Sequence, residues 1–517
     1  MEATYYYSGL PSTPVLVART SRTPWKAPTG PEAYRILKEL RVVGDHMLNA
    51  LWEDKLAPRL HDLLGSMKVN WTSTDVVRIG IVGEPESSAP IILWIGVVPT
   101  SLSGDDGIAV ASKCQELLHQ YDIVDIEVEI RESIVTRSTS PKLLVPTSRF
   151  DPTAEVREPL TTTLGLPIYA QLGGTGGFFI TEGGDTKRLL LVTARHVLFS
   201  SNTTPNTLFR HKKSQPRQNV TLFSGAAFAA YLESIKAEIE DRADTIGSLG
   251  DFIRANARRA EKEEVAKAEQ QEARHELDKL TRAKTVLNTF YDEVSSRWAT
   301  PESCLLGHVI LSPPLSTVAG CEGYMEDWGI IEVNPSKVDA SNFDGNAIDL
   351  GTHIPRKKFM EMMYPDLRNR NSFKYPDDRL LKLKGTISDE EMRHPAAFDQ
   401  EGSKCLMVIK RGKTTGLTIG RANNIFSFTR QCFGHGDPQI SKEWAILPFD
   451  TESGAFSDKG DSGSVIVDGR GRIGGLLTGG AGDTLSSDIA YATPIDFLLR
   501  RMQENGLHKP NVNPVLT

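Results

Sequence analysis

The stretch GDSGSVIVDGRGRIGGLLTGGAGD, residues 460–483, gives the strongest indication of the fold. A serine that acts as a nucleophile needs a sharp loop, which exposes its hydroxyl and surrounds it with backbone N–H groups. Gly460 and Gly463 on either side of Ser462 permit such a loop, because glycine adopts backbone conformations that other residues avoid. A G-D-S-G sequence alone is as often an ordinary glycine-rich turn, so Ser462 needs partners elsewhere in the chain.

Two short motifs supply candidate partners. In TARHV (193–197), His196 follows an apolar run, and a general base needs an imidazole fixed at such a strand end. Asp327 opens the apolar run DWGIIEV (327–333), where a buried carboxylate is costly unless it accepts hydrogen bonds. The His196 imidazole would satisfy that need. Each motif alone is weak, since His196 could be a structural histidine and Asp327 could cap a strand.

The order of the three residues is more specific than any single motif. His196, Asp327 and Ser462 follow one another as in the chymotrypsin-like fold, and not as in subtilisin or the α/β-hydrolases. The intervals between them are long for that fold. Two insertions, residues 224–298 and 352–396, account for the excess length.

Taken together, these residues resemble the trypsin-like serine proteases, and most closely their bacterial α-lytic and streptogrisin branch. GKTTG (412–416) resembles the segment that opens the second barrel in that branch, and GLLTGGAG (475–482) resembles its substrate-binding strand. GTGGF (174–178) and YATPI (491–495) resemble the segments before the histidine and before the terminal helix. The resemblance covers about residues 165–503 without the insertions.

This resemblance implies two six-stranded barrels with the site in the cleft between them. By position, Ser462 would attack the scissile carbonyl, His196 would take the serine proton, and Asp327 would orient the imidazole. The backbone N–H groups of Gly460 and Ser462 would form the oxyanion hole. No metal or cofactor is required. The strand residues expected to pair with the substrate backbone are Thr478, Gly479 and Gly480.

The sequence also departs from the family pattern. Phe456 stands six residues before Ser462, where an acidic residue would favour Lys or Arg in the substrate, so it is a candidate substrate-binding residue without an assigned preference. Arg195 replaces a small residue, and Ser464 replaces a glycine. The I-V-G-G start of a mature enzyme is absent, so activation by a freed terminus is not expected.

The predicted fold class is α+β and multidomain. It comprises a chymotrypsin-like double β-barrel with an inserted helical hairpin, preceded by a small α/β domain. Periodicity and turn residues predict an extended arm at 1–30, the α/β domain at 31–135, a linker at 136–161, the protease-like domain at 162–503 and a tail at 504–517.

The two insertions have different patterns. Residues 224–298 are charged and helical, with apolar positions at heptad-like spacing, and Gly247 and Gly250 predict the turn between two helices. Such a hairpin either packs only on itself or serves partner docking or self-association. Residues 352–396 contain short helical patterns and are predicted to connect the two barrels.

Composition and charge limit the cellular location and the binding partners that we expect for this protein. The chain of 517 residues carries a net charge of -7, which does not favour nucleic-acid binding. We find no secretory signal and no apolar run long enough to span a membrane. Five sparse cysteines are expected to be reduced thiols, which favours a cytoplasmic protein. The segment ARTSRTPWKAPTGPEAY (18–34) resembles fungal cytosolic members of the family.

Two functions remain open at this point. The first is an intracellular serine endopeptidase that cleaves protein or peptide substrates through an acyl-enzyme, with its N-terminal domain and helical insert for regulation or docking. The second is a catalytically silent protease-fold module that binds a strand without cleaving it.

Overall fold

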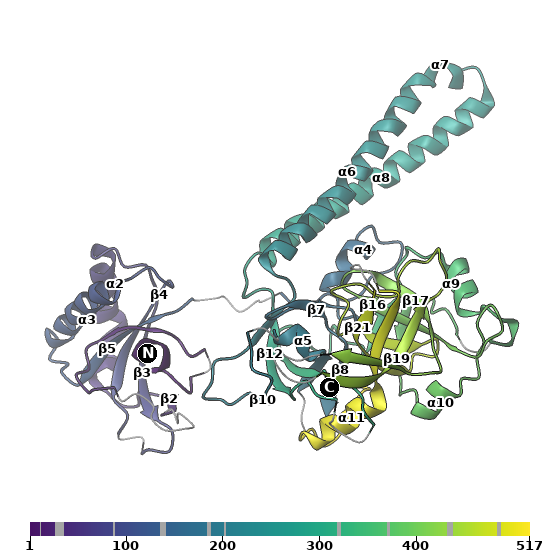
Figure 1. Ribbon diagram of the computed structural model, residues 1–517. Helices are drawn as coiled ribbons and strands as arrows, with labels where there is room; N and C mark the ends of the chain where they lie inside the picture. The colour runs from purple at the N-terminus through teal and green to yellow at the C-terminus, as the bar shows by residue number, and fades with distance from the viewer. Residues whose placement is uncertain are drawn as a thin grey trace. The chain divides into compact units, whose positions relative to one another are not determined.

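The computed structural model divides the chain into two compact units, residues 1–139 with 212–216 and residues 140–211 with 217–517 (Figure 1). The structure describes residues 1–10, 12–25, 36–85, 88–134, 141–183, 188–200, 203–317, 322–369, 373–431, 438–482 and 487–516. Within these ranges, no helix is both long and apolar enough to cross a membrane.

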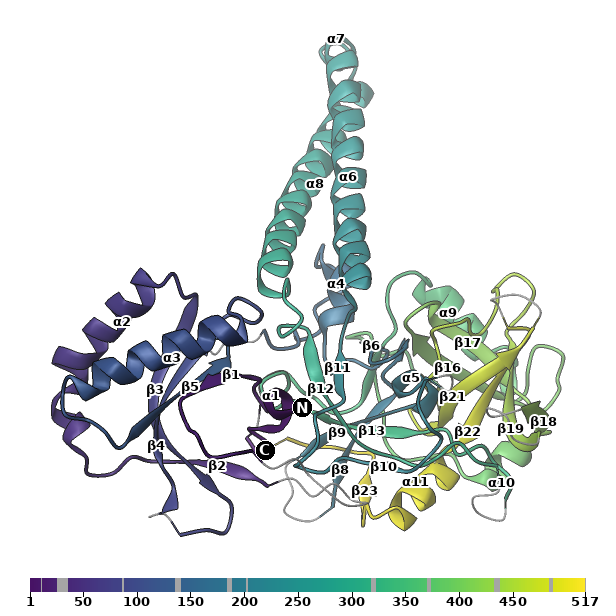
Figure 2. The same ribbon diagram turned by 60° about the vertical axis from the view of Figure 1, so that its left-hand side comes forward.

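The first unit is a five-stranded sheet with helices packed on it (Figure 2). Strand β4 is buried at every position, because its alternate side chains enter two different apolar clusters. One cluster includes α2 (Ala57–Ser66) and α3 (Gly104–His119). The strands, in pairing order, are β1 (Leu16–Arg19), β5 (Ile126–Glu132), β4 (Ile91–Val97), β3 (Trp71–Ile81) and β2 (Lys38–Arg41).

The N-terminal residues differ from the extended arm predicted for 1–30. Helix α1 (Glu2–Tyr5) and strand β1 belong to the first unit, and β1 pairs with β5. Tyr7 and Leu10 are buried in a cluster with Trp94 of β4. The proline-rich and serine-rich composition concealed these elements because each is only four residues long.

The second unit contains two large antiparallel sheets. The strands of the first sheet, in order, are β23 (Pro510–Asn511), β8 (Phe178–Glu182), β9 (Leu189–Thr193), β13 (Gly329–Val333), β12 (Leu305–Ser312), β11 (Asn219–Thr221), β6 (Pro167–Tyr169) and β7 (Gly173–Thr175), with β10 (Phe209–Arg210) paired to β12. Those of the second are β17 (Gly416–Ala422), β16 (Leu406–Gly412), β20 (Val465–Asp468), β21 (Ile473–Ala481), β22 (Ile489–Pro494), β19 (Gln439–Pro448) and β18 (Ser427–Gln431).

The second sheet closes on itself. Its strands β17 and β19 also pair with each other, so six of its strands form a ring. Closure pairs the two outer strands of the ring with each other, so that β18 is the one edge strand left among the described strands of this sheet. The ring surrounds a core that includes Trp444 and Phe456. In the described part of the chain, strand pairing closes only this one of the two predicted barrels.

Two further segments belong to the second unit instead of forming the predicted linker and tail. Within 136–161, Leu143 and Leu160 are buried in the core of this unit, and the Leu143 N–H donates to the Lys337 carbonyl. Within 504–517, β23 adds a strand to β8. Both segments are short apolar stretches without a repeating pattern, which sequence periodicity does not detect.

The connection at 352–396 contains the predicted short helices, α9 (Arg356–Met363) and α10 (Asp389–Arg393). A hairpin of two strands, β14 (Ala347–Asp349) and β15 (Leu380–Lys382), brackets α9. After β22, helix α11 (Ile495–Glu504) follows directly, as its amphipathic pattern predicts.

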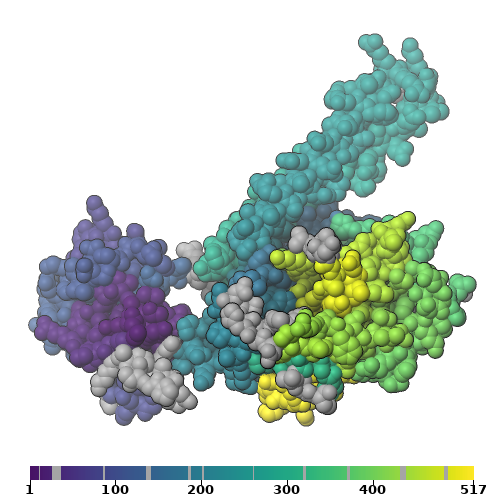
Figure 3. Space-filling model, in the orientation of Figure 1, coloured from purple at the N-terminus to yellow at the C-terminus, as the bar shows by residue number. Residues whose placement is uncertain are grey.

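The insertion at 224–298 is a helical hairpin. Helices α6 (Gly225–Ala255) and α8 (Glu264–Arg297) run side by side, joined by the short α7 (Ala257–Ala260), and they form one continuous arm in the space-filling view (Figures 1 and 3). Their bases enter the core of the second unit through Tyr231 and Phe290. The Tyr231 hydroxyl donates to the Val156 carbonyl.

The turn of this hairpin is not at Gly247 and Gly250, as predicted, but beyond Ala255. A glycine within a helix costs only about 1 kcal/mol relative to alanine. The packing of α6 along α8 outweighs that cost, so the helix continues through both glycines.

Replacing Gly247 by alanine should therefore raise the free energy of unfolding by about 1 kcal/mol, because a Cβ at this position meets no other atom within 4 Å. Thermal unfolding monitored by circular dichroism measures the change. Gly454 offers the matched control: it has equal space for a Cβ but a φ of +72°, so Gly454→Ala should destabilise the protein. A loss of stability in Gly247→Ala would contradict the reading of α6 as a continuous helix.

Candidate active site

His196 and Asp327 lie beside each other at the end of two paired strands. Gly329 of β13 faces Thr193 of β9 in an antiparallel register, so Asp327 and His196 both extend beyond the same end of the pair. The His196 Nδ1 lies 2.6 Å from Asp327 Oδ2, and the His196 backbone N–H donates to Oδ1 at 3.1 Å. The carboxylate thus fixes both the ring and the backbone of the histidine.

The pKa of His196 reflects this partner. Burial of the ring lowers the pKa, but the charge of Asp327 and its hydrogen bond outweigh burial and raise the pKa above the ordinary value of an imidazole. Nδ1 faces the carboxylate, so the neutral ring carries its proton there. Nε2 is then left with a lone pair that can accept a proton.

The segment around Asp327 has anchors that sequence reasoning missed. Glu326 is buried and forms an ion pair with Arg501 of α11, at 2.9 and 3.0 Å. The Thr493 hydroxyl donates to the Met325 carbonyl at 3.2 Å. Glu326 is adjacent to an acidic residue already assigned a role, and its partner lies far away in the sequence, so no local pattern could reveal the pair.

Arg195 also has a structural explanation. Its guanidinium is buried and donates to the Ser312 carbonyl at 3.2 Å, to the Ser312 hydroxyl at 3.1 Å and to the Thr207 carbonyl at 3.0 Å. Arginine at this position therefore ties the short helix α5 (Arg195–Leu198), which carries His196, to strand β12.

The loop that carries Ser462 packs against this histidine segment. The Ser462 carbonyl accepts from the Thr175 N–H at 2.9 Å. Gly463 has a φ of +91°, and a Cβ on it would lie 2.2 Å from the Thr175 carbonyl oxygen and 2.3 Å from the Thr193 hydroxyl. Only glycine fits this position, which brings the loop against the end of β9.

Thr175 connects the two sheets at this point. Its hydroxyl donates to the Gly460 carbonyl at 3.0 Å and accepts from the Lys413 N–H at 3.0 Å. Its own carbonyl accepts from the Thr193 hydroxyl at 2.7 Å. One buried threonine thus holds the serine loop, the GKTTG segment and the strand before His196 in register.

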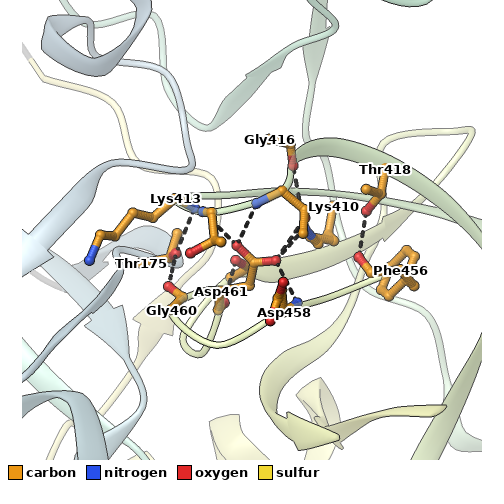
Figure 4. A network of polar contacts seen from close by, with 12 residues as sticks. Thr175, Lys410, Lys413, Gly416, Thr418, Phe456, Asp458, Gly460 and Asp461 are labelled. Atoms are coloured by element: carbon orange, nitrogen blue, oxygen red, sulfur yellow. Dashed lines mark hydrogen bonds and ion pairs between the residues drawn. The ribbon is translucent and has the colours of Figure 1, made fainter. Parts of the chain in front are cut away.

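A buried ion pair fixes the shape of the serine loop (Figure 4). Lys410 Nζ lies 2.9 Å from Asp461 Oδ2, and both side chains are 0% exposed. Asp461 also accepts from the Thr415 hydroxyl at 2.7 Å and from the backbone N–H groups of Asp458 and Thr414, at 3.0 and 2.8 Å. The carboxylate therefore joins the N-terminal side of its own loop to the residues just before β17.

The pKa of Asp461 follows from these contacts. Burial raises the pKa, but the charge of Lys410 and the donated hydrogen bonds hold it below the usual range of a carboxyl. The lysine pKa is lowered, because burial disfavours its charge more than Asp461 restores it. Each group compensates the buried charge of the other.

The predicted oxyanion hole has two N–H groups available. Among the described residues, neither the Gly460 nor the Ser462 N–H donates a hydrogen bond. The Ser462 side chain is half-exposed, and its hydroxyl also forms no hydrogen bond with any described residue. Catalytic hydrogen bonds are often long or poorly aligned before a substrate binds.

A cleft of about 560 Å³ opens beside the His196–Asp327 pair. The predicted strand residues Thr478, Gly479 and Gly480 line it together with these two side chains. From the second sheet, the other lining residues include Phe428, Thr429, Arg430, Glu443, Ala481 and Tyr491.

Phe456 lies elsewhere. Its ring is 1% exposed and packs in the core of the closed barrel, where a Cβ on Gly420 would touch it. It is not among the residues that line the cleft. The residue six positions before Ser462 is apolar here because its side chain points into the barrel core. Counting residues along the loop could not show this.

The described residues contain no group of three or more His, Cys, Asp and Glu side chains that could hold a metal ion. Three cysteines are free and buried, namely Cys114, Cys304 and Cys405. Cys321 and Cys432 lie outside the described residues.

Solved structures similar to this chain include several serine proteases. A glutamic-acid-specific serine protease, described as using a histidine triad in substrate binding, aligns with 66% of this chain and 97% of its own, at 13% identity and a TM-score of 0.31. Thermobifida fusca protease A aligns with 66% of this chain and 96% of its own, at 13% identity and a TM-score of 0.28. The active form of the Rv3671c protease from M. tuberculosis aligns with 74% of this chain and 100% of its own, at 12% identity and a TM-score of 0.25.

No family model and no curated protein matches the sequence.

Replacing Lys410 by methionine should lower the free energy of unfolding by about 3–5 kcal/mol, because it leaves the Asp461 charge buried without its cation. Urea unfolding followed by tryptophan fluorescence measures the loss. The double variant Lys410→Met with Asp461→Asn removes the stranded charge and should be more stable than Lys410→Met alone. Strictly additive losses would show that the two side chains do not act as a pair.

The imidazole of His196 should titrate above about pH 6.5, and Asp327→Asn should lower its pKa, because burial then acts unopposed. Nuclear magnetic resonance of the histidine ring protons measures both values. The raised pKa belongs to the folded state, so the pair adds stability below about pH 6.5 that is lost as pH rises through the raised value.

His308 is the internal control for this titration. Burial and the nearby Arg217 and His211 lower its pKa to about 4, independently of Asp327. A His196 pKa that stays the same in Asp327→Asn would contradict the assigned pair.

Proposed function

We propose that this chain is a serine endopeptidase that hydrolyses peptide bonds through Ser462, His196 and Asp327. The observation that carries the proposal is the direct hydrogen bond between His196 Nδ1 and Asp327 Oδ2, made at the edge of a cleft. An aspartate in this position selects the tautomer that leaves Nε2 free to act as a base. The raised pKa of the imidazole supports the same role.

In the proposed reaction, the Ser462 hydroxyl attacks the scissile carbonyl while Nε2 of His196 takes its proton. Negative charge develops on the carbonyl oxygen, and the N–H groups of Gly460 and Ser462 would donate to it. His196 then passes the proton to the leaving amine, which departs and leaves an acyl-enzyme. Water, deprotonated by the same imidazole, releases the acid product and restores the serine.

The buried network around Asp461 supports this mechanism. An oxyanion hole works only when its donors are already oriented before charge develops. Lys410 and the threonines of the GKTTG segment hold Asp461, between Gly460 and Ser462, through its side chain. The two N–H groups would therefore need no rearrangement when the substrate binds.

The substrate would add a strand to the sheet edge at Thr478, Gly479 and Gly480, which line the cleft. Backbone pairing of this kind depends little on side chains, which is suited to protein and peptide substrates. It also aligns the scissile bond with respect to His196.

A fluorophosphonate probe tests the proposal, because it reacts covalently only with an activated serine. The full-length protein should be labelled, and Ser462→Ala should abolish labelling and lower kcat/KM for peptides by on the order of a million-fold. Ser464→Ala is the matched control: Ser464 is buried with its hydroxyl bonded to the Asp461 carbonyl, so labelling should persist.

Equal labelling of the wild type and Ser462→Ala would refute the enzymatic proposal. Absence of labelling in the wild type, together with binding of extended peptides, would instead favour the catalytically silent module.

A further inference from the structure

Glu443 of β19 is a buried carboxyl group in the wall of the cleft. Its side chain lines the same cavity as His196 and Asp327, although the residue is only 2% exposed. Its Oε1 accepts a hydrogen bond from the Ser441 hydroxyl at 2.6 Å. Its Oε2 has no hydrogen-bond partner in the part of the chain that the structure describes.

A buried oxygen without a partner is costly, so its retention next to a cleft points to a ligand group that completes it. Glu443 forms no ion pair with any described residue. Apart from His196, the basic residue that lines the cleft, among those the structure describes, is Arg430 of β18, which is exposed. The carboxyl of Glu443 thus has one hydrogen-bonding position, at Oε2, that no described residue fills.

The surrounding charges favour a cation. Burial, and to a smaller extent the charge of Asp327, raise the pKa of Glu443 to about 8, against one opposing hydrogen bond from Ser441. Two acidic groups that share one cavity repel each other when both are charged. A cation placed between them relieves that repulsion, and Glu443 then releases its proton to solvent.

The cleft also has room for a long side chain. A Cβ on Gly479 would meet no atom of the described residues within 4 Å, its chain neighbours aside, so none of these residues fills the space beside it. None of the residues of the serine loop lines the cavity. The side chain of the substrate residue whose carbonyl is attacked would lie beside that loop. The residue that precedes it, called P2, would then lie toward the cavity, next to His196.

We infer that Glu443 is a specificity-determining residue, which selects lysine or arginine at P2 of the substrate. This inference rests on the proposed function and names the substrate class of the same site. The carboxylate of Glu443 would pair with the ammonium or guanidinium group, and Asp327 would add a second, longer-range attraction.

Peptides that differ only at P2, as lysine, arginine, glutamine or norleucine, test the inference. The wild type should cleave the lysine and arginine peptides at least tenfold more efficiently, by kcat/KM, than the norleucine peptide. Glu443→Gln keeps the shape of the side chain but loses the charge, and should bring this ratio to about one. The ratio is the readout because it cancels losses that affect all peptides equally.

Two variants sharpen the comparison. Arg430→Glu removes an exposed positive charge from the cleft and adds a negative one, so it should increase the lysine-to-norleucine ratio even if Glu443→Gln fails to fold. Glu332→Gln removes a carboxylate on β13 that pairs with Arg188 and does not line the cleft, so it should leave the ratio unchanged.

The outcomes separate the two proposals. If the wild type cleaves all four peptides equally, or prefers norleucine, the role of Glu443 is wrong while the endopeptidase stands. If Ser462 is not labelled and no peptide is cleaved, the endopeptidase proposal fails. Calorimetric titration of Ser462→Ala with the lysine and norleucine peptides then still decides on Glu443, because equal affinities would overturn its role without requiring catalysis.

Discussion

The ion pair between Lys410 and Asp461 is the interaction on which the candidate site most depends. Two opposite charges without solvent exposure are tolerated only when each compensates the other, so the geometry of the pair is narrowly constrained. Asp461 lies between the two residues whose N–H groups would receive the oxyanion. A change in the pair would therefore act on the loop that carries those donors.

The second constraint is the joint between the two sheets. Thr175, on β7 of the first sheet, bonds to the serine loop and to the GKTTG segment of the second sheet. His196 and Asp327 belong to the first sheet, whereas Ser462 and the strand residues that line the cleft belong to the second. The candidate site is therefore assembled from two halves, and Thr175 joins them through both its hydroxyl and its backbone N–H.

Much of the site could be predicted from the sequence because its residues lie in local patterns. Strand ends locate His196 and Asp327, and glycines at forced backbone conformations locate the loop around Ser462. The partners at long range could not be found in this way. Lys410 lies in an apolar strand, Glu326 pairs with a terminal helix, and the ring of Phe456 turned out to lie in the barrel core. Such contacts depend on which side chains meet in three dimensions, and chain spacing carries no information about that.

The helical hairpin has a mechanical consequence. Its two helices, one of them 31 residues and therefore about 45 Å long, begin and end at the adjacent strands β11 and β12. Strand β12 pairs with β13, which in turn pairs with the strand that leads to His196. A force applied at the tip of the hairpin would act over the whole length of its helices on the short strands β11 and β12. A bending force on the hairpin would therefore strain the strand pair that holds His196 and Asp327.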